Sequence, residues 1–259
     1  MSDDSIAPAT KHGGFLTELR LAVSFLTIIP VIDQQRASED AVAASFAWFP
    51  FVGFAIGVAL AGEDWLLSHV FAQVIRSVLI VISLTVVTGA VHLDGLADTA
   101  DALGAGRDRL RALDILRDSR VGTFGASAIF FDLTLKILAL STLAGDRRYA
   151  ALIIAPMLAR FAMMAVGHDL PYLRESGAGS TLLDRKHRGW RFGVTTFFVL
   201  MATTLVSPRP MGQVALGVAL AIASAGNFFY RRWLGGVTGD LIGACGELVE
   251  IAVLVAMAS

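Results

Sequence analysis

Six stretches of this chain are almost entirely apolar over close to 20 residues, and a seventh hydrophobic run follows them. A helix needs about 20 mostly apolar residues to cross the hydrocarbon core of a bilayer, so these stretches are long enough to span a membrane. The runs cover residues 42–62, 70–92, 123–144, 149–167, 191–207, 211–230 and 240–258. The sequence therefore predicts an all-α fold, a polytopic integral membrane helical bundle with about seven transmembrane helices.

The composition agrees with this prediction. Hydrophobic residues make up 55% of the chain and charged residues only 17%, whereas a soluble domain carries roughly 25% charged residues. We therefore expect membrane lipids around the protein. The net charge of −1 gives no indication of nucleic-acid binding. Cys245 is the single cysteine, which excludes a disulfide framework and a cysteine-based metal site.

The N-terminal part of the chain differs from the rest. Residues 1–14 begin with acidic side chains and lack the basic region and the hydrophobic region of a signal peptide, so we expect a disordered lead-in. The apolar run Leu19–Ile32 is interrupted by Pro30 and is too short to span comfortably. It predicts a short re-entrant or interfacial segment at the start of a single transmembrane catalytic domain, residues 15–259.

Positive charges indicate the orientation of the bundle, because loops rich in Lys and Arg stay in the cytosol. Two loops, 104–120 and 168–191, hold most of these charges, and Arg231 and Arg232 lie between the last two predicted spans. The basic residues of the two loops are Arg107, Arg109, Arg111, Arg117, Arg120, Arg174, Arg185, Lys186, Arg188 and Arg191. With seven spans we expect these loops in the cytosol and the C-terminus outside; Arg147 and Arg148 are the exception.

Three aspartates follow the second predicted span. Asp94, Asp98 and Asp101 are spaced i, i+4, i+7, so they share one narrow stripe of a helix. Carboxylates this close repel one another, and a hard cation such as Mg²⁺ removes that repulsion. Ionisable groups at membrane depth are expensive and normally functional. The stripe therefore predicts a Mg²⁺ site.

A second acidic pair begins the last predicted helix. Asp240 and Glu247 are seven residues apart and share a helix face. The glycines between them, Gly239, Gly243 and Gly246, allow neighbouring backbones to approach closely. Small-residue packing explains the glycines but not the acids. We expect Asp240, and after it Glu247, to be further metal ligands.

The loop between the second and third predicted spans carries two arginines in the segment Leu116–Thr123. Arg117 and Arg120 can hold phosphate oxygens with forked, charge-assisted hydrogen bonds. Asp118 could orient one of these arginines or join the metal, and Gly122 allows the backbone to approach a ligand. Acids and arginines together at a membrane surface indicate phosphoryl or pyrophosphate chemistry.

The same segments resemble the cobalamin synthase family, the adenosylcobinamide-GDP ribazoletransferases. The match follows nearly the whole chain, from about residue 15 to 255, in the family's order. The segments that carry it are Phe25–Pro30, Phe49–Gly53, His92–Thr99 with Asp101, Leu116–Thr123 and Gly235–Asp240.

The resemblance implies the final step of cobalamin nucleotide-loop assembly in a bacterial or archaeal inner membrane, with the active site facing the cytosol. α-Ribazole, or its 5′-phosphate, would attack adenosylcobinamide-GDP with the help of Mg²⁺, and GMP would leave. Asp94 and Asp98 would be catalytic with Arg117 and Arg120, and Arg117, Asp118, Arg120 and Gly122 would bind substrate. Which carboxylate takes the hydroxyl proton stays open, as does assembly into a homo-oligomer.

Other classes of membrane protein also place acids at helical spacing. A CDP-alcohol phosphotransferase would require an arginine soon after Asp94-Gly95, where this chain has Leu-Ala-Asp. A prenyltransferase would require paired Asn-Asp-x-x-Asp motifs, and the chain has none. A cation transporter using Asp94, Asp98 and Asp240 is the non-enzyme alternative, although it would rarely need the Arg-Asp-Ser-Arg loop.

Overall fold

The computed structural model describes residues 14–32, 37–106, 108–118, 120–173, 181, 189–207 and 210–259. Within these ranges the regular structure is helical, and the only extended pairing is a single bridge between Tyr172 and Val237. The predicted all-α fold is thus confirmed. The predicted lead-in at 1–14 lies outside the described residues except for Gly14.

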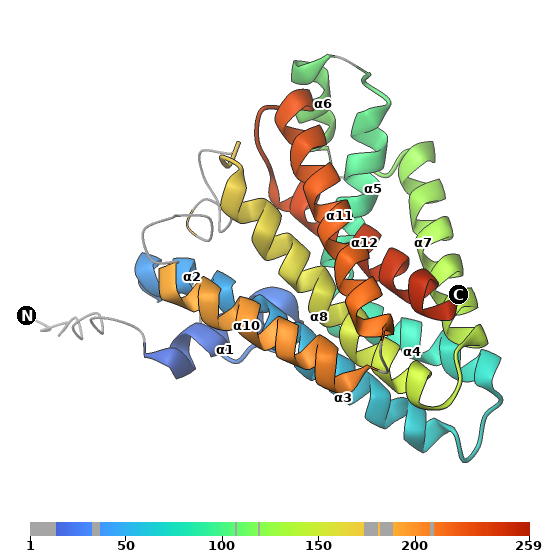
Figure 1. Cartoon of the computed structure of the whole chain (residues 1–259). Coiled ribbons are helices and arrows are strands. Elements are labelled where there is room, and N and C mark those ends of the chain that lie inside the picture. Colours follow the sequence, from blue (N-terminus) through green and yellow to red (C-terminus); the bar gives the residue numbers. More distant parts are fainter. Residues whose placement is uncertain are drawn as a thin grey trace, which may run out of the picture.

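In the part of the chain that the structure describes, six helical segments are long and apolar enough to cross a membrane, the first being Glu39–Leu67, which runs through α2, η2 and α3. Figure 1 shows α8 in the middle of the bundle, with α1, α2, α3 and α10 on one side and α5, α6 and α7 on the other. The helices are α1 Phe15–Leu26, α2 Glu39–Ser45, η2 Phe46–Trp48, α3 Phe49–Leu67, α4 Gln73–Val87, α5 Val91–Leu103, α6 Arg109–Ile115, α7 Thr123–Thr142, α8 Gly145–Asp169, α10 Gly189–Val206, α11 Met211–Trp233 and α12 Gly239–Ala258.

Helix α8 is the core of the bundle. In its most apolar window 89% of the residues are buried, against 22% for α10 and for α11. Helix α3 packs on α8 through two glycines: a Cβ atom added to Gly53 would lie 2.4 Å from the Pro156 carbonyl oxygen, and one on Gly57 would lie 2.6 Å from the Leu152 oxygen. The two backbones therefore touch, which requires glycine at both positions.

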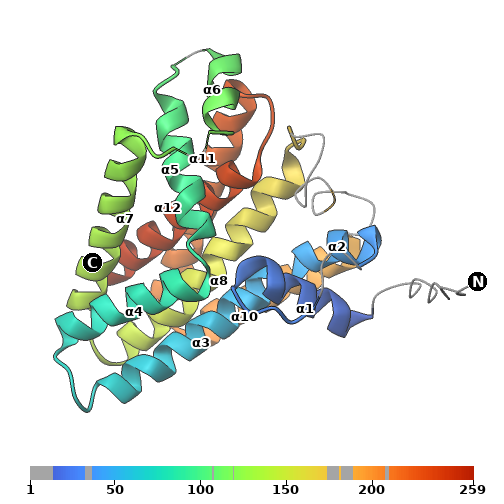
Figure 2. The same cartoon turned by 180° about the vertical axis from the view of Figure 1, so that it is seen from behind.

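The second predicted span, 70–92, is not one straight helix. Helices α4 and α5 meet at a bend of 89°, so the bundle has seven crossings only if this bent pair counts as one. The bend has a local cause, since Gly89 and Ala90 both have positive φ, 62° and 55°. Two successive left-handed residues end one helix and redirect the next. Figure 2 shows α5 rising from the end of α4.

The N-terminal segment is a short helix held against the bundle. Glu18 of α1 is buried and accepts hydrogen bonds from Arg191 Nη2 at 2.7 Å and Trp48 Nε1 at 2.8 Å. The Ile28 N–H, just after α1, donates to the Val87 carbonyl oxygen at 2.9 Å, beside the α4–α5 bend. Arg191 is therefore the ion-pair partner of α1 and not only a charge of the 168–191 loop.

Candidate active site

The aspartate stripe lies on α5, as predicted, but on a helix that begins at Val91. Asp94 is exposed, while Asp98 and Asp101 are half-buried. The three side chains share one face of the helix, as their spacing requires. The bend of 89° before α5 turns this helix, and the acids with it, out of the line of α4.

Asp101 binds the first turn of α7. Its two carboxylate oxygens accept the N–H of Gly122 at 2.6 Å and the N–H of Gly125 at 2.9 Å. These are unpaired donors at a helix N-terminus, where a negative charge is stabilising. A Cβ atom on either glycine would lie 2.5 Å or less from an Asp101 oxygen. Gly122 and Gly125 are therefore required by this contact, which fixes the arginine loop beside α5; metal binding by Asp101 stays a prediction.

Within that loop, Asp118 orients Arg120. The carboxylate accepts hydrogen bonds from Arg120 Nη2 at 2.6 Å and from Nε at 3.0 Å. The Arg120 guanidinium thereby holds the pKa of the Asp118 carboxyl below its usual value. The Arg120 side chain is 88% exposed and Arg117 is also exposed. Both guanidinium groups are thus accessible to a phosphorylated ligand, and one is already held in a fixed orientation.

Helix α12 brings Asp240 to α5. A Cβ atom on Gly95 would lie 2.8 Å from the Asp240 carbonyl oxygen, and one on Gly243 would lie 3.2 Å from the His92 Cα. The two helices therefore cross in backbone contact. Thr238 caps α12 by accepting the Leu241 N–H, and its hydroxyl donates to Asp240 Oδ2 at 3.2 Å.

The loop before α12 is joined to the α6 region. Trp233 Nε1 donates to the Gly106 carbonyl oxygen at 3.2 Å, and the Arg109 guanidinium lies next to Gly235. On its other side, the Val237 N–H donates to the Pro171 oxygen at 2.9 Å. Segments that are far apart in the sequence thus meet at one end of the bundle, where the predicted motifs lie.

The family model described as cobalamin-5-phosphate synthase matches residues 18–258, nearly the whole chain and every segment of this site. The chain belongs to the cobalamin-5-phosphate synthase family. An adenosylcobinamide-GDP ribazoletransferase of Syntrophobacter fumaroxidans is 37% identical over 243 residues, covering 92% of this chain and 96% of the relative. A protein of the same name from Geotalea daltonii is 36% identical, covering 92% and 95%. No solved structure is significantly similar to the chain.

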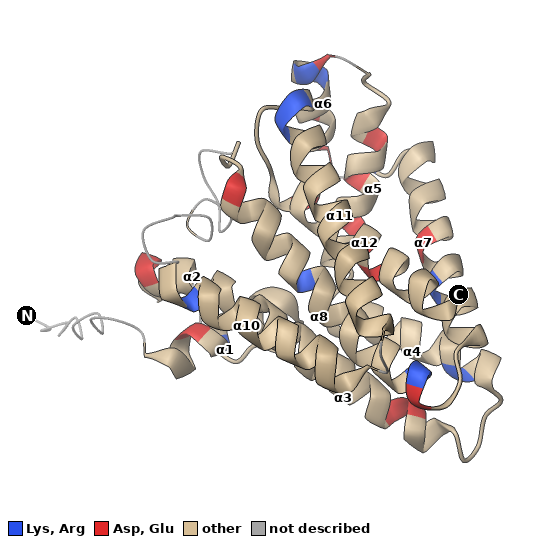
Figure 3. Ribbon diagram, viewed as in Figure 1, with Lys and Arg blue, Asp and Glu red and all other residues tan. Residues whose placement is uncertain are grey.

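Glu247, which the sequence predicts as a further metal ligand, lies in a buried group of charged side chains. We call this group the α12 cluster; it consists of Asp132, Lys136, Arg160, Glu247 and Glu250. Lys136 of α7 binds the Glu247 carboxylate and lies 3.1 Å from both Glu250 and Asp132. Arg160 of α8 binds Glu250 at 2.6 Å. Figure 3 shows most charges at the ends of helices, with a small group inside on α7, α8 and α12.

Three members of the α12 cluster, Asp132, Lys136 and Arg160, were not predicted as site residues from the sequence. A signal was available, because each is an ionisable residue inside a predicted span, where such groups are normally functional. Glu247 itself is buried and ion-paired, and its role as a metal ligand stays a prediction.

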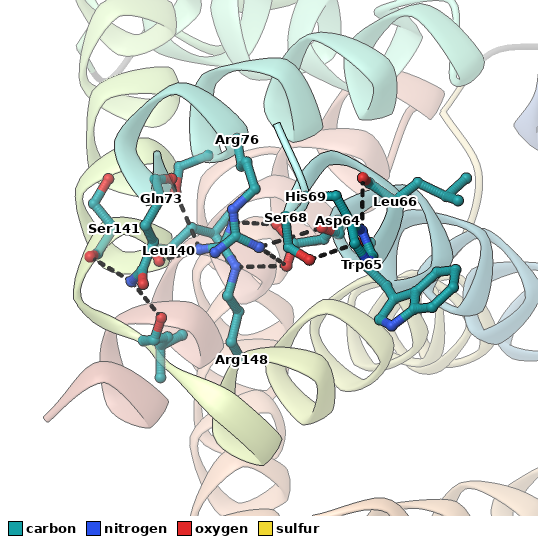
Figure 4. A network of polar contacts seen from close by, with 12 residues as sticks. Asp64, Trp65, Leu66, Ser68, His69, Gln73, Arg76, Leu140, Ser141 and Arg148 are labelled. Atoms are coloured by element: carbon teal, nitrogen blue, oxygen red, sulfur yellow. Dashed lines mark hydrogen bonds and ion pairs between the residues drawn. The ribbon is translucent and has the colours of Figure 1, made fainter. Parts of the chain in front are cut away.

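A second buried group, the Asp64 cluster, consists of Asp64, Arg76 and Arg148 and lies at the other end of the bundle (Figure 4). Arg148 Nη2 and Arg76 Nη1 donate to the Asp64 carboxylate at 2.6 Å and 2.7 Å. Arg148 also donates to the Ser77 hydroxyl and the Leu140 carbonyl oxygen. Arg148 was one of the two exceptions to the charge asymmetry of the loops, and its burial explains it; Arg147, the other exception, is exposed.

Among the described residues, no group of three or more His, Cys, Asp or Glu side chains has the arrangement of a metal site. Mg²⁺, however, commonly takes only one or two carboxylates and completes its shell with water and substrate phosphate oxygens. Asp94 and Asp98 on one accessible face, with Asp240 on the helix that crosses α5, are the donor chemistry that such an ion prefers.

Proposed function

We propose that this chain transfers adenosylcobinamide phosphate from adenosylcobinamide-GDP to α-ribazole or α-ribazole 5′-phosphate, releasing GMP and forming adenosylcobalamin or its 5′-phosphate. The reaction is that of its relatives, which are named adenosylcobinamide-GDP ribazoletransferases. One observation carries the proposal for this chain. The aspartates of α5, the arginine loop and the start of α12 converge through Asp101–Gly122 and Gly95–Asp240 contacts.

In this proposal the acids and the arginines have separate tasks. Asp94, Asp98 and Asp240 would hold Mg²⁺, which supplies neutralisation of the charge that develops on the pyrophosphate. Arg117 and Arg120 bind the phosphoryl oxygens, and Asp118 keeps Arg120 in the orientation for a two-pronged contact. Gly122 leaves room for the Asp101 carboxylate, which holds the arginine loop beside α5; substrate binding by Gly122 itself stays a prediction.

The transfer forms one phosphorus–oxygen bond and breaks another. The 3′-hydroxyl oxygen of ribazole attacks the phosphorus on the cobinamide side, and the bond to the GMP oxygen breaks. The hydroxyl proton passes to a carboxylate of the site, for which Asp94 and Asp98 are the accessible groups on α5. We place this site on the cytosolic side of the membrane, because the loop that carries Arg109, Arg111, Arg117 and Arg120 is basic.

The test is direct. Purified protein in lipid is given adenosylcobinamide-GDP, α-ribazole and Mg²⁺, and both GMP and the cobalamin product are measured. We expect both products in equal amounts, and neither when α-ribazole or Mg²⁺ is left out. GMP release that does not require α-ribazole would indicate hydrolysis and would contradict the transfer.

A further inference from the structure

The α12 cluster lies inside the bundle and joins three helices. Lys136 comes from α7, Arg160 from α8, and Glu247 and Glu250 from α12, and all four side chains are buried. The Arg160–Glu250 distance is 2.6 Å and the Lys136–Glu250 distance is 3.1 Å. Glu250 therefore accepts from two helices at once, so α12 is bound to both.

Charges in this position are costly compared with apolar side chains. A buried ion pair generally adds little stability beyond what hydrophobic residues of the same volume would provide, because each charge loses its hydration. Three carboxylates share two cations in the cluster, and Asp132, 3.1 Å from Lys136, depends on an ammonium group that Glu247 and Glu250 also use. Packing between the helices could be achieved by apolar side chains and does not by itself require buried charges. Charged pairs do, however, define one rotation and one depth of a helix, because only one register brings the partners together.

The register of α12 also determines the position of Asp240, which lies in the first turn of this helix. Glu247 is seven residues, about two turns, from Asp240, and Gly243 lies between them against His92 of α5. A slip of α12 by one residue would move Asp240 by about 1.5 Å and rotate it by about 100° relative to α5. A displacement of about 1 Å in a catalytic group can cost about 10²-fold in rate.

Helix α7 is held at two levels. Its first turn binds Asp101 of α5, and Lys136, further along, binds Glu247 and Glu250 of α12. The helices that carry Asp94, Asp98 and Asp240 are thus connected both directly, at Gly95 and Gly243, and through α7.

We propose that Lys136 and Arg160 are positioning residues: by binding Glu247 and Glu250 they fix the register of α12 and hold Asp240 beside Asp94 and Asp98. The inference rests on the proposed function for its consequence in catalysis. The contacts that define the register do not depend on that function.

The experiment compares the two buried clusters. The triple variant Asp132→Asn/Lys136→Met/Glu247→Gln leaves the Arg160–Glu250 pair intact and no buried charge without a partner. The matched control, Asp64→Asn/Arg76→Gln/Arg148→Met, removes all the charges of the Asp64 cluster at the far end and likewise leaves no buried charge without a partner. Two quantities are measured in each: the Mg²⁺ concentration for half-maximal GMP release, and amide hydrogen exchange in residues 236–243.

We expect the triple variant to need at least tenfold more Mg²⁺, a displacement effect of the size expected for a misplaced site, and to exchange faster at 236–243. The control should change neither. Because Glu247 is itself a predicted metal ligand, hydrogen exchange is the deciding measurement. Unchanged exchange at 236–243 in the triple variant, or equal changes in both variants, would overturn the inference whatever the Mg²⁺ requirement. Should the triple variant not fold, Glu247→Asp, which keeps the charge but shortens the side chain, is tested in the same way.

Failure of the proposed function would be recognised separately. Wild-type protein without GMP release would refute that function, while hydrogen exchange would still decide the inference. Faster exchange at 236–243 in the triple variant alone supports the fixed register, and unchanged exchange contradicts it.

Discussion

The α12 cluster and the Asp64 cluster are both buried groups of charge, yet they are built differently. In the Asp64 cluster one carboxylate binds two arginines, and Arg148 also binds the backbone, so the acid is fully compensated. In the α12 cluster three acids share two cations. The Asp64 cluster lies at the end of the bundle where short connections join the helices. The α12 cluster lies beneath the candidate site. The two clusters thus have opposite imbalances of formal charge: two cations share one acid in the Asp64 cluster, and three acids share two cations in the α12 cluster.

The largest expected difference between the two ends is their accessibility from outside the cell. In a Cys245→Ser background, Val70→Cys lies in the turn before α4, and Ala105→Cys lies in the turn after α5. An impermeant thiol reagent on intact cells should label the cysteine at 70 and not the one at 105. Labelling at 105 would reverse the orientation and place the candidate site outside.

Removing one arginine from the Asp64 cluster should weaken the fold most. Arg148→Met leaves the buried Asp64 with Arg76 alone and removes the donor to Ser77 and to the Leu140 carbonyl oxygen; the loss of buried hydrogen bonds to a charged group costs about 1.5–3 kcal/mol. We expect that loss in the free energy of unfolding in mixed micelles, with normal turnover by the molecules that stay folded. Arg147→Met, at the exposed neighbour, is the control and should have no effect. If Arg148→Met lowered turnover without lowering stability, the Asp64 cluster would have a role in catalysis and the expected difference between the two clusters would be wrong.

Removing a charge at the candidate site should lower turnover without lowering stability. Asp98→Asn keeps the size of the side chain and removes the charge that the cation needs, so GMP release should fall by about 10²-fold or more. Stability should not fall, because a repelling charge is removed. Asp114→Asn, at an exposed acid of α6, serves as the control. An unchanged Mg²⁺ activation curve for Asp98→Asn would remove this residue from the metal site.

The arginine loop allows a finer distinction between charge and geometry. Arg120→Lys preserves the charge but not the two-pronged contact that Asp118 orients. We expect a loss of about 10²-fold in turnover, with the orientation of the protein unchanged. Arg111→Lys in α6 should be silent. Equal turnover for both variants would show that Arg120 acts only as a positive charge that sets the orientation of the protein in the membrane.

The smallest effect should come from the α5–α7 contact. An alanine at Gly125 would place its Cβ 2.4 Å from Asp101 Oδ2, and overpacking of this kind costs about 1–3 kcal/mol. Gly217→Ala in α11, with no atom within 4 Å of its Cβ position, should cost nothing. Equal stabilities would show that Asp101 moves aside easily and does not fix the loop.

Hydropathy was sufficient to predict the bundle, because lipid accepts only long apolar helices and nearly every such run became one. It did not predict the bend at Gly89–Ala90, since residues 70–92 form one mostly apolar run and an alanine with positive φ carries no sequence signal. Spacing predicted the shared face of Asp94, Asp98 and Asp101. It treated the three acids alike, although Asp101 faces the start of α7.

The pairing of Lys136 with Glu247 was beyond sequence reasoning for a physical reason. The two residues lie on different spans that are distant in the chain, and nothing in either segment specifies its neighbour. A single sequence reveals that a charge is buried, but the partner depends on how the helices pack.

The contact of Gly95 with Asp240 also has a consequence for biosynthesis. Helix α5 is made well before α12, and the N-terminal parts of a chain generally fold first. Helix α5 must therefore wait without this packing partner until α12 has been made. A chain that terminates between α11 and residue 240 would contain most of the helices and still lack the α5–α12 crossing, and with it the candidate site.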